Sequence, residues 1–319
     1  MLRGEPADFS REHVVWAYRL FLGREPESEA VIATKLQCWS SLADLQRDLL
    51  NSLEYQRNSS ESYPASLEPQ RTRVVIKEIA PGLRLFVDLN DRHIGQNIVY
   101  DLYELNEREF ILSQLREGET VIDLGANIGF FSILMAGKVG KSGSVYAFEP
   151  LPKNAGLLAR SIAENHFDDR VILERAAIGA EPGQLDLISP RRTDNWGGAY
   201  LRLGEMNVPQ DHEAISVPVL RLDDYRLRRP VSFIKIDVEG AEALVIRGAE
   251  RLLREDRPTM LCEINPSQLA TVSQVTPNEL LAAFARLNYR CQLLTQKGLS
   301  EPIERYEARE IANLALTAR

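Results

Sequence analysis

The stretch from Val121 to Phe130, VIDLGANIGF, constrains the fold of this chain more than any other segment. An apolar run carries Asp123, two glycines follow at a spacing of four, and a second apolar run begins at once. This order is typical of a buried strand, a tight turn and a helix. Gly125 and Gly129 tolerate positive φ and allow the backbone to approach a ligand closely. The start of the helix directs its free N–H groups toward the same place.

A second predicted strand, residues 144–148, ends at Glu149, 26 residues after Asp123. An acidic residue at this position can accept both hydrogens of a ribose diol. A nicotinamide-binding loop would normally read Gly-x-Gly-x-x-Gly, whereas this loop reads Gly-x-x-x-Gly behind an aspartate that would repel a pyrophosphate. Asp123 suits a ligand that carries an ammonium group and no phosphate. S-adenosylmethionine is such a ligand.

A second candidate centre is the segment from Lys235 to Glu242, KIDVEGAE, at the end of an apolar strand. Lys235 and Asp237 share a face because strand side chains alternate. One acidic residue would be enough to cap the following helix. The turn carries three, Asp237, Glu239 and Glu242, which favours a functional site over a simple cap.

Strand and helix patterns alternate through most of the chain. Strands are predicted at residues 121–124, 144–148, 171–173, 232–237, 258–263, 290–294 and 313–317, with an antiparallel excursion at 184–188 and 214–220 whose two strands are separated by a long polar loop. A helix is predicted at 241–253, and His93 is expected to be a surface or helix-start residue rather than a catalytic base. The pattern predicts an α/β fold with a doubly wound, mostly parallel sheet that binds ligands at the carboxyl ends of its strands. Four acidic residues end such strands: Asp123, Glu149, Asp237 and Glu263.

The chain is predicted to have two parts. Residues 1–58 form a small all-α module with Ser10 as the first N-cap and a third helix at 41–55, residues 59–72 form a Ser-, Pro- and Glu-rich linker, and residues 73–319 form the α/β domain. That domain opens with a hairpin, 73–79 and 83–89, and one helix over 91–115. The helical module is either a packing cap or a docking element.

Composition excludes several classes of protein. A net charge of −8 without blocks of like charge gives no sign of nucleic-acid binding. The three cysteines lack metal-binding spacing, and Cys262 lies in an apolar run. No apolar run approaches the roughly 20 residues of a membrane span, and the N-terminus lacks a signal-peptide pattern. We therefore expect a soluble, cytoplasmic protein.

These pieces, in this order, resemble the FkbM family of S-adenosylmethionine-dependent methyltransferases, which have the class I Rossmann-like fold. The resemblance covers residues from about 95 to 295 and rests on 121–129, 147–150 with Asn154, Asn165, 176–179, Gly197-Gly198, 235–242 and Glu263. Residues 18–26, with Trp39 and 52–55, are similar to a small helical domain of unknown function that often adjoins glycosyltransferases and methyltransferases.

The resemblance implies a role for each matching residue. The methionine half of S-adenosylmethionine would lie by Asp123, Gly125, Ala126, Asn127 and Gly129; the ribose by Glu149, with Pro150 and Asn154 nearby; and the adenine by Ala176 and Ala177. Asp237 would lie near the transferable methyl group. Where the family often has Glu-x-His, this chain has Glu263-Ile-Asn265, which removes a candidate histidine base. Family members are mostly O-methyltransferases of sugar or secondary-metabolite hydroxyls.

Methyl transfer to a hydroxyl needs a group that takes the hydroxyl proton. We expect Asp237 to be this base or a metal ligand, with Lys235 orienting its charge, and Glu239 and Glu263 as further candidates. A divalent cation held by Asp237 and Glu263 is possible, although oxygen ligands have no diagnostic spacing. Asn195, Trp196 and Gly198 offer an amide and an aromatic face for a sugar, so this loop is the expected acceptor site.

Two other readings stay open. A nicotinamide-dependent oxidoreductase is disfavoured by Asp123 and by the missing third glycine. A non-catalytic scaffold that binds the cofactor and docks to a glycan-assembly complex is the second. The expected partners are a small-molecule or glycan acceptor, and a second copy or docking partner held through the N-terminal helices.

Overall fold

The computed structural model describes residues 10–19, 24–38, 74–91, 93–191, 196–204 and 207–319. The chain divides into two compact units, which are described separately. Met1–Val74 and Asp88–Tyr103 form the first, and Val75–Val87 and Glu104–Arg319 form the second. The predicted helix at 41–55 and the predicted linker at 59–72 lie outside the described residues.

The first unit contains α1 (Arg11–Ala17), α2 (Glu29–Cys38) and α5 (Ile94–Val99). Ser10 precedes α1 as the predicted N-cap, and its N–H donates to His13 Nδ1 at 3.0 Å. The prediction of one helix over 91–115 is wrong. The segment forms α5 and then α6 (Leu105–Gln114), because Asp101 (φ 58°) and Glu104 (φ 44°) adopt a left-handed backbone that ends one helix before the next begins.

The second unit is built on an eight-stranded sheet with the order β13-β12-β14-β11-β10-β3-β4-β5. Its strands are β3 (Thr120–Leu124), β4 (Ser144–Phe148), β5 (Val171–Glu174), β10 (Val231–Ile236), β11 (Thr259–Ile264), β12 (Tyr289–Thr295), β13 (Gly298–Ile303) and β14 (Ala312–Ala318). The five strands from β5 to β11 are parallel, and β14 runs antiparallel between β11 and β12. The predicted doubly wound, mostly parallel sheet is confirmed. β13 was not predicted.

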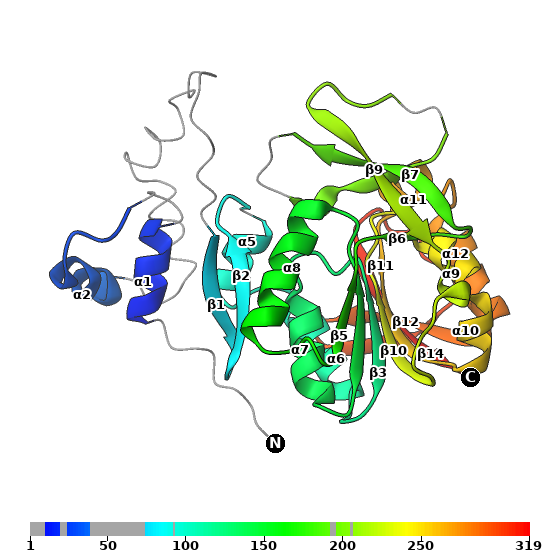
Figure 1. Ribbon diagram of the computed structural model, residues 1–319, viewed down its shortest axis with the longest axis horizontal. Coiled ribbons are helices and arrows are strands. Elements are labelled where there is room, and N and C mark those ends of the chain that lie inside the picture. The colour runs from blue at the N-terminus through cyan, green and yellow to red at the C-terminus, as the bar shows by residue number, and fades with distance from the viewer. Residues whose placement is uncertain (1–9, 20–23, 39–73, 92, 192–195, 205–206) are drawn as a thin grey trace. The chain divides into compact units, whose positions relative to one another are not determined.

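Helices cover both faces of this sheet (Figure 1). On one face lie α6, α7 (Phe130–Val139) and α8 (Pro152–Glu164); on the other lie α9 (Glu242–Gly248), α10 (Glu250–Glu255) and α12 (Pro277–Arg286). Along β10 the side chains alternate accordingly. Ile234 and Ile236 join the buried cluster of α9 and α12, whereas Phe233 contacts Phe110 of α6 with ring centroids 6.4 Å apart. The predicted helix at 241–253 divides into α9 and α10.

A separate four-stranded sheet holds the excursion that follows β5. Its order is β6 (Ala177–Ile178), β9 (His212–Leu220), β7 (Gly183–Pro190) and β8 (Tyr200–Arg202). The antiparallel pairing of β7 with β9 confirms the prediction. The connection between them, expected to be a polar loop, contains the 3-10 helix η2 (Trp196–Gly198) and β8. The hairpin of β1 (Val74–Ala80) and β2 (Leu83–Asp88) was also predicted correctly.

Three further observations bear on the remaining predictions. No helix in the described part of the chain has both the length and the hydropathy needed to cross a membrane. Cys262 is buried in the core, as expected from its apolar run. His93 is exposed and immediately precedes α5, in agreement with a helix-start residue rather than a buried base.

Candidate active site

The loop between β3 and α7 is attached to the two strands that flank β3. The N–H groups of Gly125 and Ala126 donate to the Phe148 carbonyl at 3.0 Å, and the N–H of Asp237 donates to the Leu124 carbonyl at 3.0 Å. Gly125 has φ +78°, and a Cβ there would lie 1.7 Å from the Asp237 carbonyl oxygen. Only glycine allows this approach. The two centres predicted from sequence therefore form one site.

Asp123 lies at the bottom of this site with 1% of its surface exposed. Its Oδ2 accepts a hydrogen bond from Ser132 Oγ at 2.6 Å, whereas its Oδ1 has no partner among the described residues. Burial raises the pKa of Asp123, although the Lys235 charge and Ser132 partly oppose this. A buried, unsatisfied carboxylate oxygen fits the ammonium group of S-adenosylmethionine, as the sequence suggested.

Glu149 holds the glycine loop in place. Its Oε2 accepts the N–H of Asn127 and its Oε1 accepts the N–H of Leu151, both at 2.8 Å. Burial raises its pKa to about 7, against the lowering effect of these two N–H groups. Each oxygen keeps a second lone pair, so the geometry is compatible with a ribose diol. The ribose contact itself stays a prediction.

Lys235 and Asp237 form the most buried ion pair of the site. Lys235 Nζ lies 2.8 Å from Asp237 Oδ2 and 5.0 Å from the centroid of the Phe131 ring. The Lys235 side chain is buried, whereas the Asp237 side chain is 24% exposed. In the strand register Lys235 also stands beside Asp123. Burial would lower the pKa of Lys235, but the charges of Asp237, Glu104 and Asp123 raise it above its usual value, so Lys235 is a permanent cation.

Three more carboxyl groups gather around this pair. Burial, reinforced by neighbouring negative charges, raises the pKa of Glu239 to about 8, of Glu242 to about 7 and of Glu263 to about 10. Glu239 has a left-handed backbone, with φ 50°. Glu242 Oε1 accepts the Gly240 N–H at 3.1 Å, and its Oε2 has no partner within the described part of the chain. At neutral pH the site thus holds carboxyl groups in both protonation states.

Two residues of this site were missed from sequence. Ser132 is the first polar side chain of an otherwise apolar helix start, a signal that could have indicated a buried hydrogen-bonding role. Glu104 immediately precedes α6, and its charge acts on both Lys235 and Glu263. Nothing in the spacing of the sequence relates Glu104 to residues more than 100 positions away.

The other residues predicted to bind the cofactor are packed against neighbouring elements, and this packing accounts for part of the sequence pattern. A Cβ on Gly129 (φ +94°) would lie 2.3 Å from Leu158 Cδ1, so this glycine packs against α8. Asn154 is buried in α8, one turn after Pro150, and Ala176 and Ala177 are buried where β6 begins. Their contacts with the cofactor stay predictions.

The acceptor loop is only partly within the described residues. Gly198 ends η2 and is half-buried. Asn195 and the Trp196 side chain lie outside the described residues. Their predicted role in acceptor binding is therefore untested.

Asn265, which stands where the family often has the histidine of Glu-x-His, has a structural role in this chain. It is the N-cap of α11 (Pro266–Thr271), and its Oδ1 accepts the Gln268 N–H at 3.3 Å and the Ser267 hydroxyl at 2.8 Å. The position serves the start of a helix here. No cluster of three or more His, Cys, Asp or Glu side chains within the described residues is arranged to hold a metal ion, so the predicted cation has no support.

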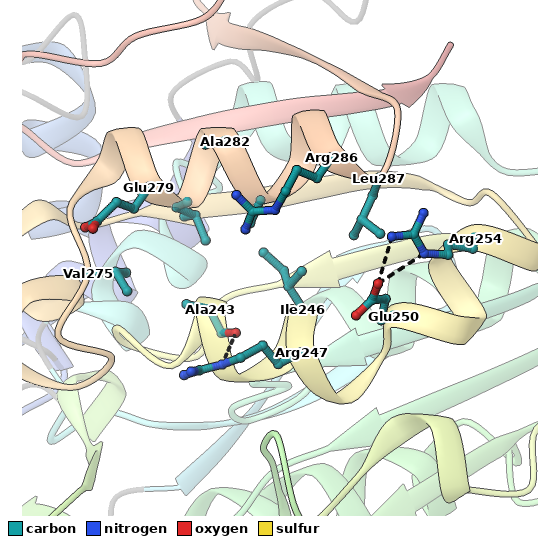
Figure 2. Close-up of a pocket in the computed structure, with 12 residues that line it drawn as sticks. Ala243, Ile246, Arg247, Glu250, Arg254, Val275, Glu279, Ala282, Arg286 and Leu287 are labelled. Carbon is teal, nitrogen blue, oxygen red and sulfur yellow. Dashed lines mark hydrogen bonds and ion pairs between the residues drawn. The ribbon is translucent and has the colours of Figure 1, made fainter.

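A groove of about 490 Å³ lies apart from these residues (Figure 2). Helices α9, α10 and α12 form its walls, with Ile246 between them and Arg247, Arg254 and Arg286 at its edges. Arg254 is paired with Glu250 at 2.7 Å, and Arg247 donates to the Ala243 carbonyl. None of the predicted site residues lines it.

The parallel sheet with an antiparallel strand inserted near one edge, the glycine loop after β3 and the acid after β4 define a class I methyltransferase fold. Comparison with known protein families then identifies the family of methyltransferases to which the chain belongs. The methyltransferase FkbM domain matches residues 123–291, more than half of the chain, and this protein belongs to that family.

The sequence identity to individual relatives is low. The chain is 27% identical to Methyltransferase 1 of Beauveria bassiana over 53% of this chain and 70% of that protein. It is 30% identical to the 31-O-demethyl-FK506 methyltransferase FkbM of Streptomyces tacrolimicus over 43% of this chain and 62% of that enzyme. A solved FkbM methyltransferase from Methylobacillus flagellatus is 19% identical, with a TM-score of 0.39 over 71% of this chain and 55% of that one.

Proposed function

We propose that this protein transfers a methyl group from S-adenosylmethionine to a hydroxyl group of a sugar, a glycan or a secondary metabolite. The observation that carries the proposal is the Lys235–Asp237 pair, with Nζ and Oδ2 2.8 Å apart beside the glycine loop. It combines a partly exposed carboxylate with a buried cation that orients it. One relative is named as a methyltransferase of 31-O-demethyl-FK506, which supports a hydroxyl acceptor.

The residues around the loop fit the cofactor. Asp123 Oδ1 would accept from its ammonium group, Glu149 from its ribose, and the backbone at Gly125 would lie against its methionine half. When bound, S-adenosylmethionine supplies an electrophilic methyl group. The protein's part is to hold the acceptor hydroxyl in line with that group and to exclude water.

Asp237 would accept the proton of the acceptor hydroxyl. The Asp237 side chain is more exposed to solvent than that of its partner Lys235, and the ion pair with Lys235 holds the carboxylate at a fixed position. Glu239 and Glu263 would line the acceptor side, where protonated carboxyl groups can donate hydrogen bonds to acceptor oxygens. Lys235 is a cation across the working pH range and cannot be the base.

The first test is the substitution Asp237→Asn, assayed by release of S-adenosylhomocysteine with a panel of sugars and hydroxylated metabolites. General-base catalysis is worth about 100- to 10,000-fold, so kcat should fall by that factor while the affinity for S-adenosylhomocysteine stays within about threefold. Asp224→Asn, an exposed aspartate outside the site, is the matched control. Full activity in Asp237→Asn would refute the assignment of the base.

The cofactor can be tested before an acceptor is known. A ligand at about 100 times its Kd stabilises a protein by about 2.7 kcal/mol, which gives a clear rise in Tm. S-adenosylmethionine and S-adenosylhomocysteine should each stabilise the protein, and NAD should not. Stabilisation by NAD alone would favour an oxidoreductase. Cofactor binding without turnover on any acceptor would favour a scaffold.

We further propose that residues 1–58 form a helical module, joined through a linker at 59–72 to the domain at 73–319. This module would dock the enzyme to a partner or to a second copy.

A further inference from the structure

Gly240, in the turn after β10, has both of its backbone polar groups bonded to side chains. Its N–H donates to Glu242 Oε1 at 3.1 Å, and its carbonyl oxygen accepts a hydrogen bond from Ser273 Oγ. Glu242 is the first residue of α9, whereas Ser273 lies 33 residues after Gly240, between α11 and α12. Two separate parts of the second unit therefore hold one residue of this turn.

Both of these side chains are buried, with 1% of Glu242 and 7% of Ser273 exposed. Because water cannot replace a buried hydrogen bond, the loss of either contact would leave a backbone group of Gly240 unsatisfied. Burying a carboxyl group is costly in itself, and an apolar side chain would fill the place of Glu242 without that cost. The hydrogen bond to Gly240 is therefore the use that the structure makes of this carboxyl group.

The backbone of α11 packs directly against Gly240. A Cβ on Gly240 (φ +93°) would lie 2.4 Å from the Gln268 carbonyl oxygen and 2.5 Å from the attached carbon. This carbonyl is fixed within α11, because it accepts the N–H of Val272 at 2.8 Å, and Asn265 caps the start of the helix. Ser273 follows Val272 directly. One short segment after β11 thus supplies both the packing contact and the hydrogen bond to the Gly240 carbonyl.

Asp237 begins the turn that these contacts hold. Its N–H donates to the Leu124 carbonyl at 3.0 Å, and its Oδ2 accepts from Lys235 Nζ at 2.8 Å. The rest of the turn needs separate support, because Glu239 has a left-handed backbone with φ 50°. This conformation is unfavourable for residues other than glycine and persists only where the surroundings hold it. The contacts of Gly240, the next residue, provide that support.

We propose that Glu242 and Ser273 are positioning residues of the active site: by holding Gly240 from two sides, they keep the turn after β10 in the conformation that presents Asp237 to the acceptor. A displaced turn would rotate the backbone that carries the Asp237 carboxylate. In-line transfer is sensitive to displacements of about 1 Å. The proposal rests on the proposed function for the identity of Asp237 as the base, whereas the support of the turn can be tested without an acceptor.

The first readout is amide hydrogen exchange at residues 237–241, measured on the full chain. Ser273→Ala removes the donor to the Gly240 carbonyl. Glu242→Met removes the acceptor of the Gly240 N–H and keeps an unbranched side chain of similar length. Each substitution should speed exchange in this segment about 3- to 10-fold, the effect of one lost hydrogen bond on local opening. Exchange in β3 should stay within about twofold of the wild-type rate.

Two further variants are matched controls. Glu242→Gln keeps an acceptor oxygen on a side chain of the same length, so the hydrogen bond from Gly240 is retained. Thr271→Ala removes a hydroxyl of α11 that donates to the Ser267 carbonyl at 2.9 Å and not to the turn. Both controls should leave exchange at 237–241 within about twofold of the wild-type rate. Exchange at the wild-type rate in the two test variants would overturn the proposal.

The second readout separates positioning from stability and uses an acceptor identified in the panel of sugars and hydroxylated metabolites. We normalise kcat to the number of sites that bind S-adenosylhomocysteine, so that unfolded protein does not count. For Ser273→Ala the normalised kcat should fall about tenfold, while KM for the acceptor and Kd for S-adenosylhomocysteine change by less than about threefold. A lower Tm with unchanged normalised kcat would show that the hydroxyl only stabilises the fold, and would refute the positioning role.

The double variant tests whether the two side chains act through the same residue. If both act through Gly240, Glu242→Met combined with Ser273→Ala should lower kcat by much less than the product of the two single effects. Effects that multiply would show independent roles and refute the shared action. If instead Asp237→Asn is fully active, the base assignment fails, while the exchange test of the turn stands.

Discussion

At the scale of single residues, Asp123 and Ser132 form a buried hydrogen-bonded pair at the bottom of the candidate site. A buried carboxylate oxygen without a hydrogen bond costs about 1–3 kcal/mol unless a ligand satisfies it. Asp123 Oδ1 is in this state among the described residues, while Ser132 Oγ supports Oδ2 at 2.6 Å. The hydrogen bond from the serine favours the ionised form of this carboxyl group and opposes the rise in its pKa that burial causes. The pair is suited to hold a cationic group.

This arrangement predicts the effect of Ser132→Ala. Asp123 would lose its hydrogen bond, its pKa would rise further, and its carboxylate would be less available to an ammonium group. We expect the affinity for S-adenosylmethionine to fall about tenfold, measured by calorimetry at pH 7.5, with part of the loss recovered at pH 9. A loss that does not depend on pH would mean that Ser132 acts only through packing.

At the scale of elements, the closest approach in the site joins the β3–α7 loop to the end of β10. Gly125 makes it possible, because a Cβ there would lie 1.7 Å from one backbone oxygen and 2.8 Å from the attached carbon of Asp237. A backbone atom cannot move aside as a flexible side chain can. The β3–α7 loop and the turn after β10 can therefore separate only if the sheet itself deforms.

We predict that Gly125→Ala is much more destabilising than Gly82→Ala. Both glycines have positive φ, +78° and +74°, but nothing lies within 4 Å of a Cβ on Gly82 in the β1–β2 turn. Gly82→Ala should cost only the left-handed penalty of about 1–2 kcal/mol. Gly125→Ala should cost at least about 2 kcal/mol more in urea unfolding, or fail to fold. Equal costs would show that strain in φ, and not the contact with Asp237, explains Gly125.

Two helices were predicted as longer than they are, and for one of them the reason lies elsewhere in the chain. The break between α9 and α10 is stabilised by Asp223, whose carboxylate accepts the N–H groups of Arg251 and Leu252 at 2.9 Å each. Asp223 is 28 residues before Arg251 in the sequence. Because the apolar pattern continues across the break, periodicity alone predicts one helix.

At the scale of the whole molecule, the carboxyl groups of the site whose pKa values are raised determine how the stability of the protein depends on pH. Glu149 and Glu242 have pKa values of about 7 and Glu239 of about 8, against about 4.5 in the unfolded chain. Each therefore contributes stability that is present below pH 4.5 and is lost as pH rises through 7 to 8. One pKa unit corresponds to about 1.4 kcal/mol.

We therefore predict that the unliganded protein has a higher Tm at pH 6 than at pH 8.5, by about 5 °C or more. The exposed acids with lowered pKa values, such as Asp169 and Glu279, titrate below this range and do not offset the effect. Saturating S-adenosylhomocysteine should reduce the difference, because a ribose diol that donates to Glu149 favours its ionised form. A Tm that rises from pH 6 to pH 8.5 would contradict the pKa assignments.

Much of this protein follows from the sequence alone, because local patterns report local physics. The apolar runs predict the parallel strands, the spacing of Gly125 and Gly129 predicts the turn, and acids at strand ends predict the edge where the site lies. Tertiary structure decided what depends on contacts between distant residues. It set the register that places Lys235 beside Asp123, the approach of Gly125 to Asp237, the break before α10 and the action of the Glu104 charge on Lys235. These features depend on how strands pair and helices pack, and no short stretch of sequence contains that information.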